Sequence, residues 1–417
     1  MTEHDIERTK ETIIHSIEQT NDENKLHIVS SIMKTENKKL LMKVGSFFEL
    51  DAEEYDTTIS YIRSYFTDRC GFTKSIVDNL IQKIKHYGML KLCRILFVEI
   101  EGSNDYEFLS VNSLLNNDNI FDLIKKYTKS VICKSNEYTY EDIEEEFDAF
   151  IKSIANFNIG GKVATGKMEF LTIMFLKDLN LRNMPSLGFG LCDINGNNCG
   201  LEYKISGARI QGNLEQSKPF SFEKSNRHFI RLVTERLSNN SDAEQFLNEL
   251  STMNNIFRNS TDKEVGQNTK EVLEKIYELG ISNFDINEMI IDSLNEQFKI
   301  KFMTDDDKRY IIENYPVVHE SKHINLDNLK TIWLVLHLCN YWKAERWDWL
   351  VLFDKDSNNE MTGKYVLIEK PDETDIVKSM DRNMNKSNKV YSASFPCYGK
   401  GTNDQNQSPM IKYKKQH

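Results

Sequence analysis

Apolar residues recur at helical spacing through most of the first 157 residues. Side chains three and four positions apart share one face of a helix, so each such segment predicts an amphipathic helix with one buried side. The predicted helices are residues 5–17, 25–33, 51–66, 73–87 and 121–127. One segment differs, because the chain from Cys93 to Ile100 is apolar almost continuously and predicts a strand. We therefore expect a mainly helical N-terminal domain over residues 1–157.

The pattern changes after residue 157. The segment from Phe170 to Leu176 is apolar nearly all round, which predicts a fully buried helix. Two short apolar runs, at residues 191–194 and 200–204, then flank the pair Asn195-Gly196. Because Asn-Gly between two such runs is a strong hairpin signal, we expect two neighbouring strands here.

A second helix–strand region lies far downstream. Residues 327–343 predict another buried helix, followed by apolar strands at 347–353 and 364–369. A helix that crosses to a buried strand extends the sheet of an α/β core. The residues between the two regions return to amphipathic helical spacing, at 222–237, 243–257, 270–279 and 286–298. We predict an α/β core split into residues 158–212 and 325–417, with residues 213–324 as a large helical insertion.

The predicted hairpin carries charged residues that suggest chemistry. Residues two apart in a strand share a face, so Glu202 and Lys204 should point the same way, with Asp193 near the end of the neighbouring strand. Two carboxylates and a lysine at one place are costly unless a metal ion or a phosphate compensates. Hard oxygen ligands suit Mg²⁺ or Mn²⁺, and a neighbouring lysine can orient an attacking water.

Composition narrows the class of protein. The chain has 417 residues, of which 39% are hydrophobic and 28% charged, as in globular proteins with sizeable cores. A net charge of −11 argues against a protein that coats nucleic acid. An acidic chain can still carry a basic surface at one place. The N-terminus is polar and acidic, so we expect no secretory signal there. No apolar run approaches the ~20 residues of a membrane span. The seven cysteines are scattered without a Cys-x-x-Cys motif, so we expect reduced thiols in a cytoplasmic protein.

The segment from Asp375 to His417 is basic. Its positive residues are Lys378, Arg382, Lys386, Lys389, Lys400, Lys412, Lys414 and Lys415, and its aromatic residues are Tyr391, Phe395, Tyr398 and Tyr413. This interleaving suits a strip along nucleic acid, in which Lys400 and Lys412 would contact DNA. A solvated tail that offsets the acidic body would have the same composition. The sequence leaves both interpretations open.

Glu169 on the first buried helix, Asp193, and the run Glu202-Tyr203-Lys204 resemble the signature of the PD-(D/E)XK nuclease superfamily. The superfamily core, of restriction-endonuclease-like fold, has a helix, a three-strand antiparallel run, a crossover helix and a further strand. A similar order is found at residues 166–180, the hairpin, 327–345 and 347–353. The chain is most similar to phage-encoded members, with a Gly-Lys-x-Glu helix start and a Gly-x-Arg after the lysine strand. Cys192 stands where the family has a proline.

The resemblance implies a nuclease that hydrolyses DNA phosphodiester bonds with Mg²⁺ or Mn²⁺ as cofactor. Asp193 and Glu202 would be metal ligands, Glu169 an auxiliary ligand, and Lys204 would position the attacking water. Arg209 would contact a phosphate. We expect DNA as the partner in a bacterial host cytoplasm, and leave open a homo-oligomer or phage virion components as further partners. The alternative function is a non-catalytic phage structural or DNA-handling protein that keeps the same fold.

Residues 161–167 have the glycine and lysine spacing of a phosphate-binding P-loop. Such a loop requires Ser or Thr at the next position to hold Mg²⁺, and this chain has Met168 there. The segment before the loop, residues 155–159, is also a poor strand. We interpret these glycines as a loop that leads into a helix.

The sequence from His319 to His323 matches H-E-x-x-H, which on a helix places two histidines on one zinc ion. A zinc peptidase of this kind needs a third ligand beyond the pair, for which Glu345 is the candidate. Pro316 lies just upstream, and the buried helix starts afresh near residue 325. We favour histidines exposed in a loop, and keep the zinc peptidase as the less favoured alternative.

Overall fold

The computed structural model describes residues 52–69, 72–96, 111–135, 139–157, 167–175, 189–192, 198–210, 282–298, 303–318, 325–345, 347–372, 374–394 and 410–415. The helices predicted at residues 5–17, 25–33, 222–237, 243–257 and 270–279 lie outside the described residues. Within the described stretches, no helix is long and apolar enough to cross a lipid bilayer. Helices and strands both occur, which confirms the predicted mixture of α and β structure.

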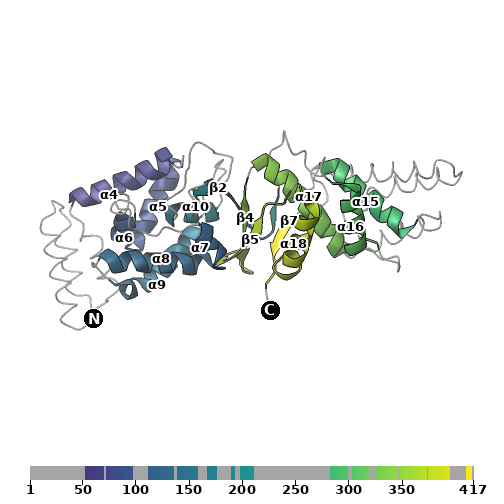
Figure 1. Cartoon of the computed structure of the whole chain (residues 1–417). Helices are drawn as coiled ribbons and strands as arrows, with labels where there is room; N and C mark the ends of the chain where they lie inside the picture. Colours follow the sequence, from purple (N-terminus) through teal and green to yellow (C-terminus); the bar gives the residue numbers. More distant parts are fainter. Residues whose placement is uncertain are drawn as a thin grey trace, which may run out of the picture. The chain divides into compact units, whose positions relative to one another are not determined.

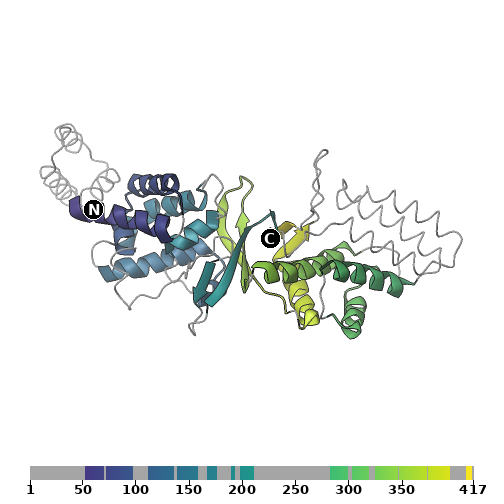
Figure 2. The same cartoon turned by 90° about the horizontal axis from the view of Figure 1, so that it is seen from above.

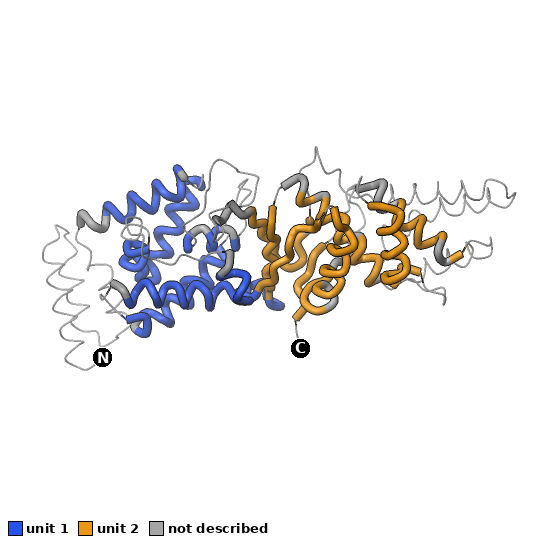
Figure 3. Tube along the Cα trace, in the orientation of Figure 1, with its two compact units in different colours: residues 1–198, 356–364 blue, residues 199–355, 365–417 orange. Residues whose placement is uncertain are grey.

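The chain divides into two compact units, which Figure 3 colours separately. Unit 1 comprises residues 1–198 and 356–364, and unit 2 comprises residues 199–355 and 365–417. Two helices of the predicted insertion, α15 (Asn283–Phe298) and α16 (Asp305–Asn314), pack within unit 2 against α17 (Leu326–Glu345) and α18 (Ile376–Lys389). The predicted domain boundaries at residues 157, 212 and 324 stay a prediction.

Unit 1 is built from helices that pack around aromatic rings. They are α4 (Ala52–Ser64), the π turn η1 (Tyr65–Arg69), α5 (Lys74–His86), α6 (Leu90–Arg94), α7 (Val111–Leu115), α8 (Ile120–Ser135), the 3-10 turn η4 (Tyr140–Asp142), α9 (Glu144–Ala155) and α10 (Lys167–Phe175) (Figure 1). The helices predicted at 51–66, 73–87 and 121–127 are confirmed. The predicted buried helix is α10. The centre of its Phe170 ring lies 5.0 Å from the ring centre of Phe72 and 5.5 Å from those of Phe66 and Phe157.

The strand predicted from Cys93 to Ile100 is wrong where the structure describes it. Cys93 belongs to helix α6, and Ile95 and Leu96 keep helical backbone geometry. Both neighbouring leucines, Leu90 and Leu92, are buried as well. Periodicity over a short and mostly apolar run cannot distinguish a strand from a helix segment.

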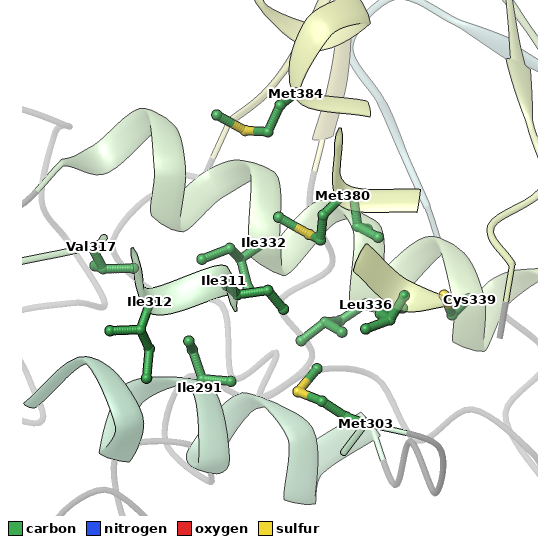
Figure 4. Close-up of a cluster of buried hydrophobic side chains, with 12 residues drawn as sticks. Ile291, Met303, Ile311, Ile312, Val317, Ile332, Leu336, Cys339, Met380 and Met384 are labelled. Carbon is green, nitrogen blue, oxygen red and sulfur yellow. The ribbon is translucent and has the colours of Figure 1, made fainter. Parts of the chain in front are cut away.

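Helix α17 is buried on two faces, which explains why its sequence is apolar nearly all round. Its helical face, defined by Ile332, Val335, Leu336 and Cys339, packs in one apolar cluster with residues of α15, α16 and α18 (Figure 4). Its sheet face, defined by Leu334, His337, Leu338 and Tyr341, packs against strand residues such as Leu350 and Leu352. Figures 1 and 2 show α18 alongside α17, as the packing contacts between them require.

A four-stranded sheet has the order β1-β2-β4-β5. The strands are β1 (Phe189–Cys192), β2 (Asn198–Ile205), β4 (Trp349–Lys355) and β5 (Met361–Glu369). Strands β2 and β4 are parallel, and Glu202 lies opposite Leu350 while Lys204 lies opposite Leu352. Parallel neighbours need a crossover connection, and α17 precedes β4 in this connection. The strands predicted around 191–194, 200–204, 347–353 and 364–369 are confirmed with shifted ends.

The described part of the basic C-terminal segment is folded. After α18 come β6 (Tyr391–Ser394) and β7 (Met410–Tyr413), which form a small sheet with β3 (Ala208–Arg209) in the order β3-β7-β6. Tyr391 and Ile411 are fully buried against the sheet face of α17. The interpretation of this segment as a solvated tail is therefore wrong for the described residues.

Candidate functional site around Glu202 and Lys204

Strand β2 holds Glu202 and Lys204 in direct contact. The two residues are two positions apart and share a face of the strand, as alternation along a strand requires. Lys204 Nζ donates a short hydrogen bond of 2.5 Å to Glu202 Oε1, so the contact is also an ion pair. A charge-assisted bond between an ammonium group and a carboxylate is among the stronger interactions available to side chains.

Helix α17 closes this face of β2 with Tyr341. The Tyr341 hydroxyl donates to the same oxygen, Glu202 Oε1, at 2.5 Å. Lys204 Nζ lies 5.4 Å from the centre of the Tyr341 ring, within the range of a cation–π contact. One tyrosine therefore touches both members of the pair, through its hydroxyl and through its ring.

The pair is buried unevenly. The Glu202 side chain keeps 11% of its surface exposed, whereas the Lys204 side chain keeps 20%. A buried ion pair adds little net stability because the loss of hydration offsets the attraction, while removal of one partner leaves an uncompensated charge. Net stability by itself therefore does not explain why the pair is present.

Both ends of β2 are anchored, which fixes where the pair points. At the start of the strand, the Gly200 amide donates to Asp348 Oδ2 at 2.9 Å, and the Asp348 amide donates to the Gly200 carbonyl at 2.7 Å. At its end, the Ser206 amide donates to the Phe353 carbonyl at 2.8 Å. Gly207 then turns the chain with a φ of +86°, a conformation that glycine adopts without strain.

One turn before Tyr341, His337 fixes the rotation of α17 against the sheet. Its Nε2–H donates to the carbonyl oxygen of Ile210 at 2.7 Å. Burial lowers the pKa of His337 to about 4, and the hydrogen bond to Ile210 opposes this only in part. His337 is therefore neutral at pH 7, and its proton is placed on Nε2.

The other predicted site residues lie elsewhere or outside the described residues. Glu169 belongs to α10 in unit 1. Asp193 follows the end of β1 directly, but it lies outside the described residues, as does Lys400. Arg209 pairs with Met410 in the small sheet, and Lys412 is exposed on β7. Of the predicted residues, the structure brings together Glu202 and Lys204.

The donor atoms allow one metal-ligand role to be tested. Among the residues that the structure describes, no three His, Cys, Asp or Glu side chains are grouped closely enough to hold a metal ion. Lys204 and Tyr341 both bond Glu202 Oε1, and no described residue donates to Oε2. A carboxylate oxygen is the kind of donor that Mg²⁺ and Mn²⁺ accept. Glu202 fits the role of one ligand, with Asp193 and Glu169 as the predicted others.

The P-loop-like segment and the H-E-x-x-H sequence lie mostly outside the described residues. Residues 161–166 of the P-loop-like segment lie outside the described residues, and Met168 in α10 is buried. His319 and His323 also lie outside them, between Val318 and the start of α17 at Leu326. The zinc peptidase therefore stays an untested alternative.

Sequence reasoning did not identify Tyr341. Its signal was available, because His337 and Tyr341 are polar-ended residues one turn apart in an otherwise apolar helix. Two such residues four positions apart share one face, and a buried polar group requires a partner. What the sequence did not reveal is that this face meets the strand that carries Glu202 and Lys204.

Comparisons with known proteins add no family. No protein-family model matches the chain, and no curated protein and no solved structure matches it. The class that the fold itself defines is a protein of mixed α and β structure. Any function must therefore be argued from the Glu202 site and its surroundings.

Proposed function

We propose that this chain is a metal-dependent nuclease that hydrolyses DNA phosphodiester bonds, with a restriction-endonuclease-like core. The observation that carries the proposal is the 2.5 Å contact between Glu202 and Lys204 on one face of β2. These residues occupy the Glu-x-Lys positions of the signature that the sequence resembles. Strand β2 lies beside the parallel strand β4, which follows the long helix α17, an order similar to the crossover of that core.

By the resemblance of the sequence to the nuclease signature, Asp193 and Glu202 would be metal ligands and Glu169 an auxiliary ligand. A bound Mg²⁺ or Mn²⁺ ion would supply Lewis acidity toward the phosphate. Glu202 would offer Oε2 to the ion, because Oε1 is occupied by Lys204 and Tyr341. Tyr341 would thereby hold the carboxylate in one orientation.

Lys204 would act on the water that attacks phosphorus. Its ammonium group is held by Glu202 on one side and by the Tyr341 ring on another, and part of its surface remains open to solvent. An ammonium group has three donors, and the bond to Glu202 uses one of them. A remaining donor can orient the water or bond a phosphate oxygen, on which negative charge develops in the transition state.

Substitution of the pair tests this function. Glu202→Gln, Lys204→Met and Asp193→Asn should each lower the rate of plasmid and linear DNA cleavage with Mg²⁺ or Mn²⁺ by about 10²–10⁴-fold. The matched controls are Glu360→Gln and Lys364→Met, which change an exposed acid and an exposed lysine. Cleavage that survives all three site substitutions would show that the chemistry lies elsewhere.

The second candidate function is a non-catalytic protein that handles DNA or belongs to a phage particle. The observation that favours it is that Glu202 Oε1 is already satisfied within the protein by two donors. Such a pair can persist as a structural remnant of an active site. Wild-type protein that binds DNA, cuts none with either metal, and binds no Mn²⁺ would establish this function and exclude the nuclease.

A further inference from the structure

A cluster of positive charge lies at the end of unit 2 that contains the last turn of α18. Residues 383–394 and 410–415 include no Asp or Glu, although the chain as a whole carries a net charge of −11. The lysines of these two segments are Lys386, Lys389, Lys412, Lys414 and Lys415. Local charge of one sign in an otherwise acidic chain indicates a binding surface for the opposite charge.

Hydrogen bonds bring the two segments together. The Lys414 amide donates to the carbonyl of Val390 at 2.8 Å, and the Val390 amide donates to the carbonyl of Lys386 at 2.8 Å. Strands β6 and β7 are antiparallel, with Ser392 opposite Lys412. Lys412 of β7 and Lys414 just after it therefore lie beside the end of α18, although more than twenty residues separate them from it in sequence.

Alternation along these strands separates an apolar side from a charged side. Tyr391 and Ile411 are buried beneath the small sheet, so their neighbours Ser392 and Lys412 lie on its outer side. Three lysines are exposed here: Lys389 in the last turn of α18, Lys412 on the outer side of β7, and Lys415 two residues beyond the end of β7. We call these three residues the lysine surface.

The acidic residues of α18 are engaged away from this surface. Asp375 caps the start of the helix by accepting from the Lys378 amide at 2.9 Å. Asp381 accepts hydrogen bonds from the hydroxyls of Tyr310 and Tyr315. Within the described part of α18 and β7, no carboxylate is bonded to the lysine surface.

The two aromatic residues of the cluster pack against the protein. Tyr391 is fully buried, and its hydroxyl donates to Asn383 Oδ1, while Tyr413 is half-buried against the same apolar cluster. Proteins that bind single strands combine positive charge with exposed aromatic rings on which bases stack. Among the residues that the structure describes here, the lysine surface offers charge without a fully exposed ring, which suits the regularly spaced phosphates of a duplex.

We propose that the lysine surface binds the phosphate backbone of duplex DNA without regard to sequence. The proposal rests on the proposed function for the identity of the polyanion as DNA. Three lysine–phosphate contacts release about three counterions, so they should contribute ~2–3 to the slope of log K against log salt. Base readout is not required, because lysines on phosphates position a protein on DNA and do not select its sequence.

The test measures binding of a fluorescent 30-base-pair duplex and of the matching single strand, over a range of salt and in EDTA so that no cleavage occurs. The variant is Lys389→Gln/Lys412→Gln/Lys415→Gln in the full chain. The control, with the same change of charge, is Lys126→Gln/Lys152→Gln/Lys364→Gln, which alters exposed lysines of unit 1. Circular dichroism confirms that both variants are folded.

The expected result is a duplex affinity at least about 10-fold lower for the lysine-surface variant, with a salt slope smaller by ~2–3, and an unchanged slope for the control. Equal slopes for wild type and the lysine-surface variant would overturn the proposal, and so would a wild-type preference for the single strand. Cleavage by the wild type with Mg²⁺ is measured in parallel. A variant that loses binding, beside a wild type that never cuts, would retain the lysine surface and reject the nuclease.

Discussion

The two faces of α17 are equally buried but chemically different. The helical face presents Ile332, Val335, Leu336 and Cys339 to other helices, and its whole cluster is apolar (Figure 4). The sheet face includes His337 and Tyr341, each with a hydrogen bond to the strand region. One face can stabilise the unit by burial alone, whereas the other must also satisfy polar groups.

The difference separates stability from chemistry within one helix. Apolar packing is non-directional, so substitutions on the helical face should change the free energy of unfolding and leave the Glu202 site intact. Hydrogen bonds on the sheet face are directional and reach Glu202 and the end of β3. Substitutions there should alter activity or pH dependence more than the volume lost would suggest.

The largest expected effect is on the helical face. Leu336→Ala removes a fully buried side chain and leaves a cavity, so it should lower the free energy of unfolding by about 2–5 kcal/mol. The cleavage rate, measured well below the melting temperature, should stay within about threefold of wild type. Sites that share no partners usually act independently to within roughly 0.5 kcal/mol. A rate loss as great as that of Glu202→Gln would show that the two faces are not separable.

His337 should make the sheet face sensitive to acid. Its pKa is 6.5 unfolded and, because of burial, about 4 folded. The unfolded state therefore binds the proton more tightly, so stability falls as pH drops below 6.5 and the loss is complete below about 4, at about 3 kcal/mol. His337→Gln keeps a donor for Ile210 and cannot titrate, so the difference between wild type and variant in urea unfolding should vary over this pH range. A constant difference would contradict the assignment.

Tyr341→Phe should change activity more than stability. The variant keeps the ring beside Lys204 and loses the hydroxyl that holds Glu202, so kcat should fall about 10–100-fold with KM unchanged, as when a residue that orients a metal ligand is removed. Tyr391→Phe is the control, since it removes a buried hydroxyl from the same apolar cluster, away from Glu202. It should destabilise the protein without changing kcat. Equal kcat for the two variants would assign Tyr341 a purely structural role.

The smallest effect is expected at the turn that ends β2. Gly207→Ala places a Cβ at a φ of +86°, where the nearest group is Lys355 Nζ at 4.0 Å. The cost is therefore conformational, about 1 kcal/mol of unfolding free energy in thermal melts. Gly207→Asn should cost less, because asparagine tolerates this conformation better than alanine. A larger loss for asparagine would mean that space, and not backbone conformation, limits the position.

Secondary structure was predictable where the pattern of apolar residues is typical of a single element, either a helix or a strand. The helices α5 and α8 and the strands β4 and β5 were recognised because amphipathic or apolar runs of their lengths have few alternatives. Cys93 was assigned to a strand because periodicity over a short, mostly apolar run does not distinguish a strand from a helix. The helix predicted from residue 286 would place Asp285 at its cap, but α15 begins at Asn283. The Asp285 amide donates to Ser282 Oγ at 3.2 Å, and its carboxylate accepts from the Ser282 hydroxyl at 2.6 Å. The sequence does not show whether Ser282 or Asp285 caps the helix, because the side chains of both residues can accept a hydrogen bond from a backbone amide.

The sequence by itself determined that Glu202 and Lys204 share one face of a strand, because alternation depends on the backbone alone. It also determined that α17 is buried, because a helix without a polar face has no stable place in water. Only the tertiary structure decided which face of α17 meets that strand, and therefore that Tyr341 bonds Glu202. It likewise decided that Tyr391 of the basic segment is buried while Lys412 is exposed. These outcomes depend on contacts between residues distant in the chain, which local pattern does not encode.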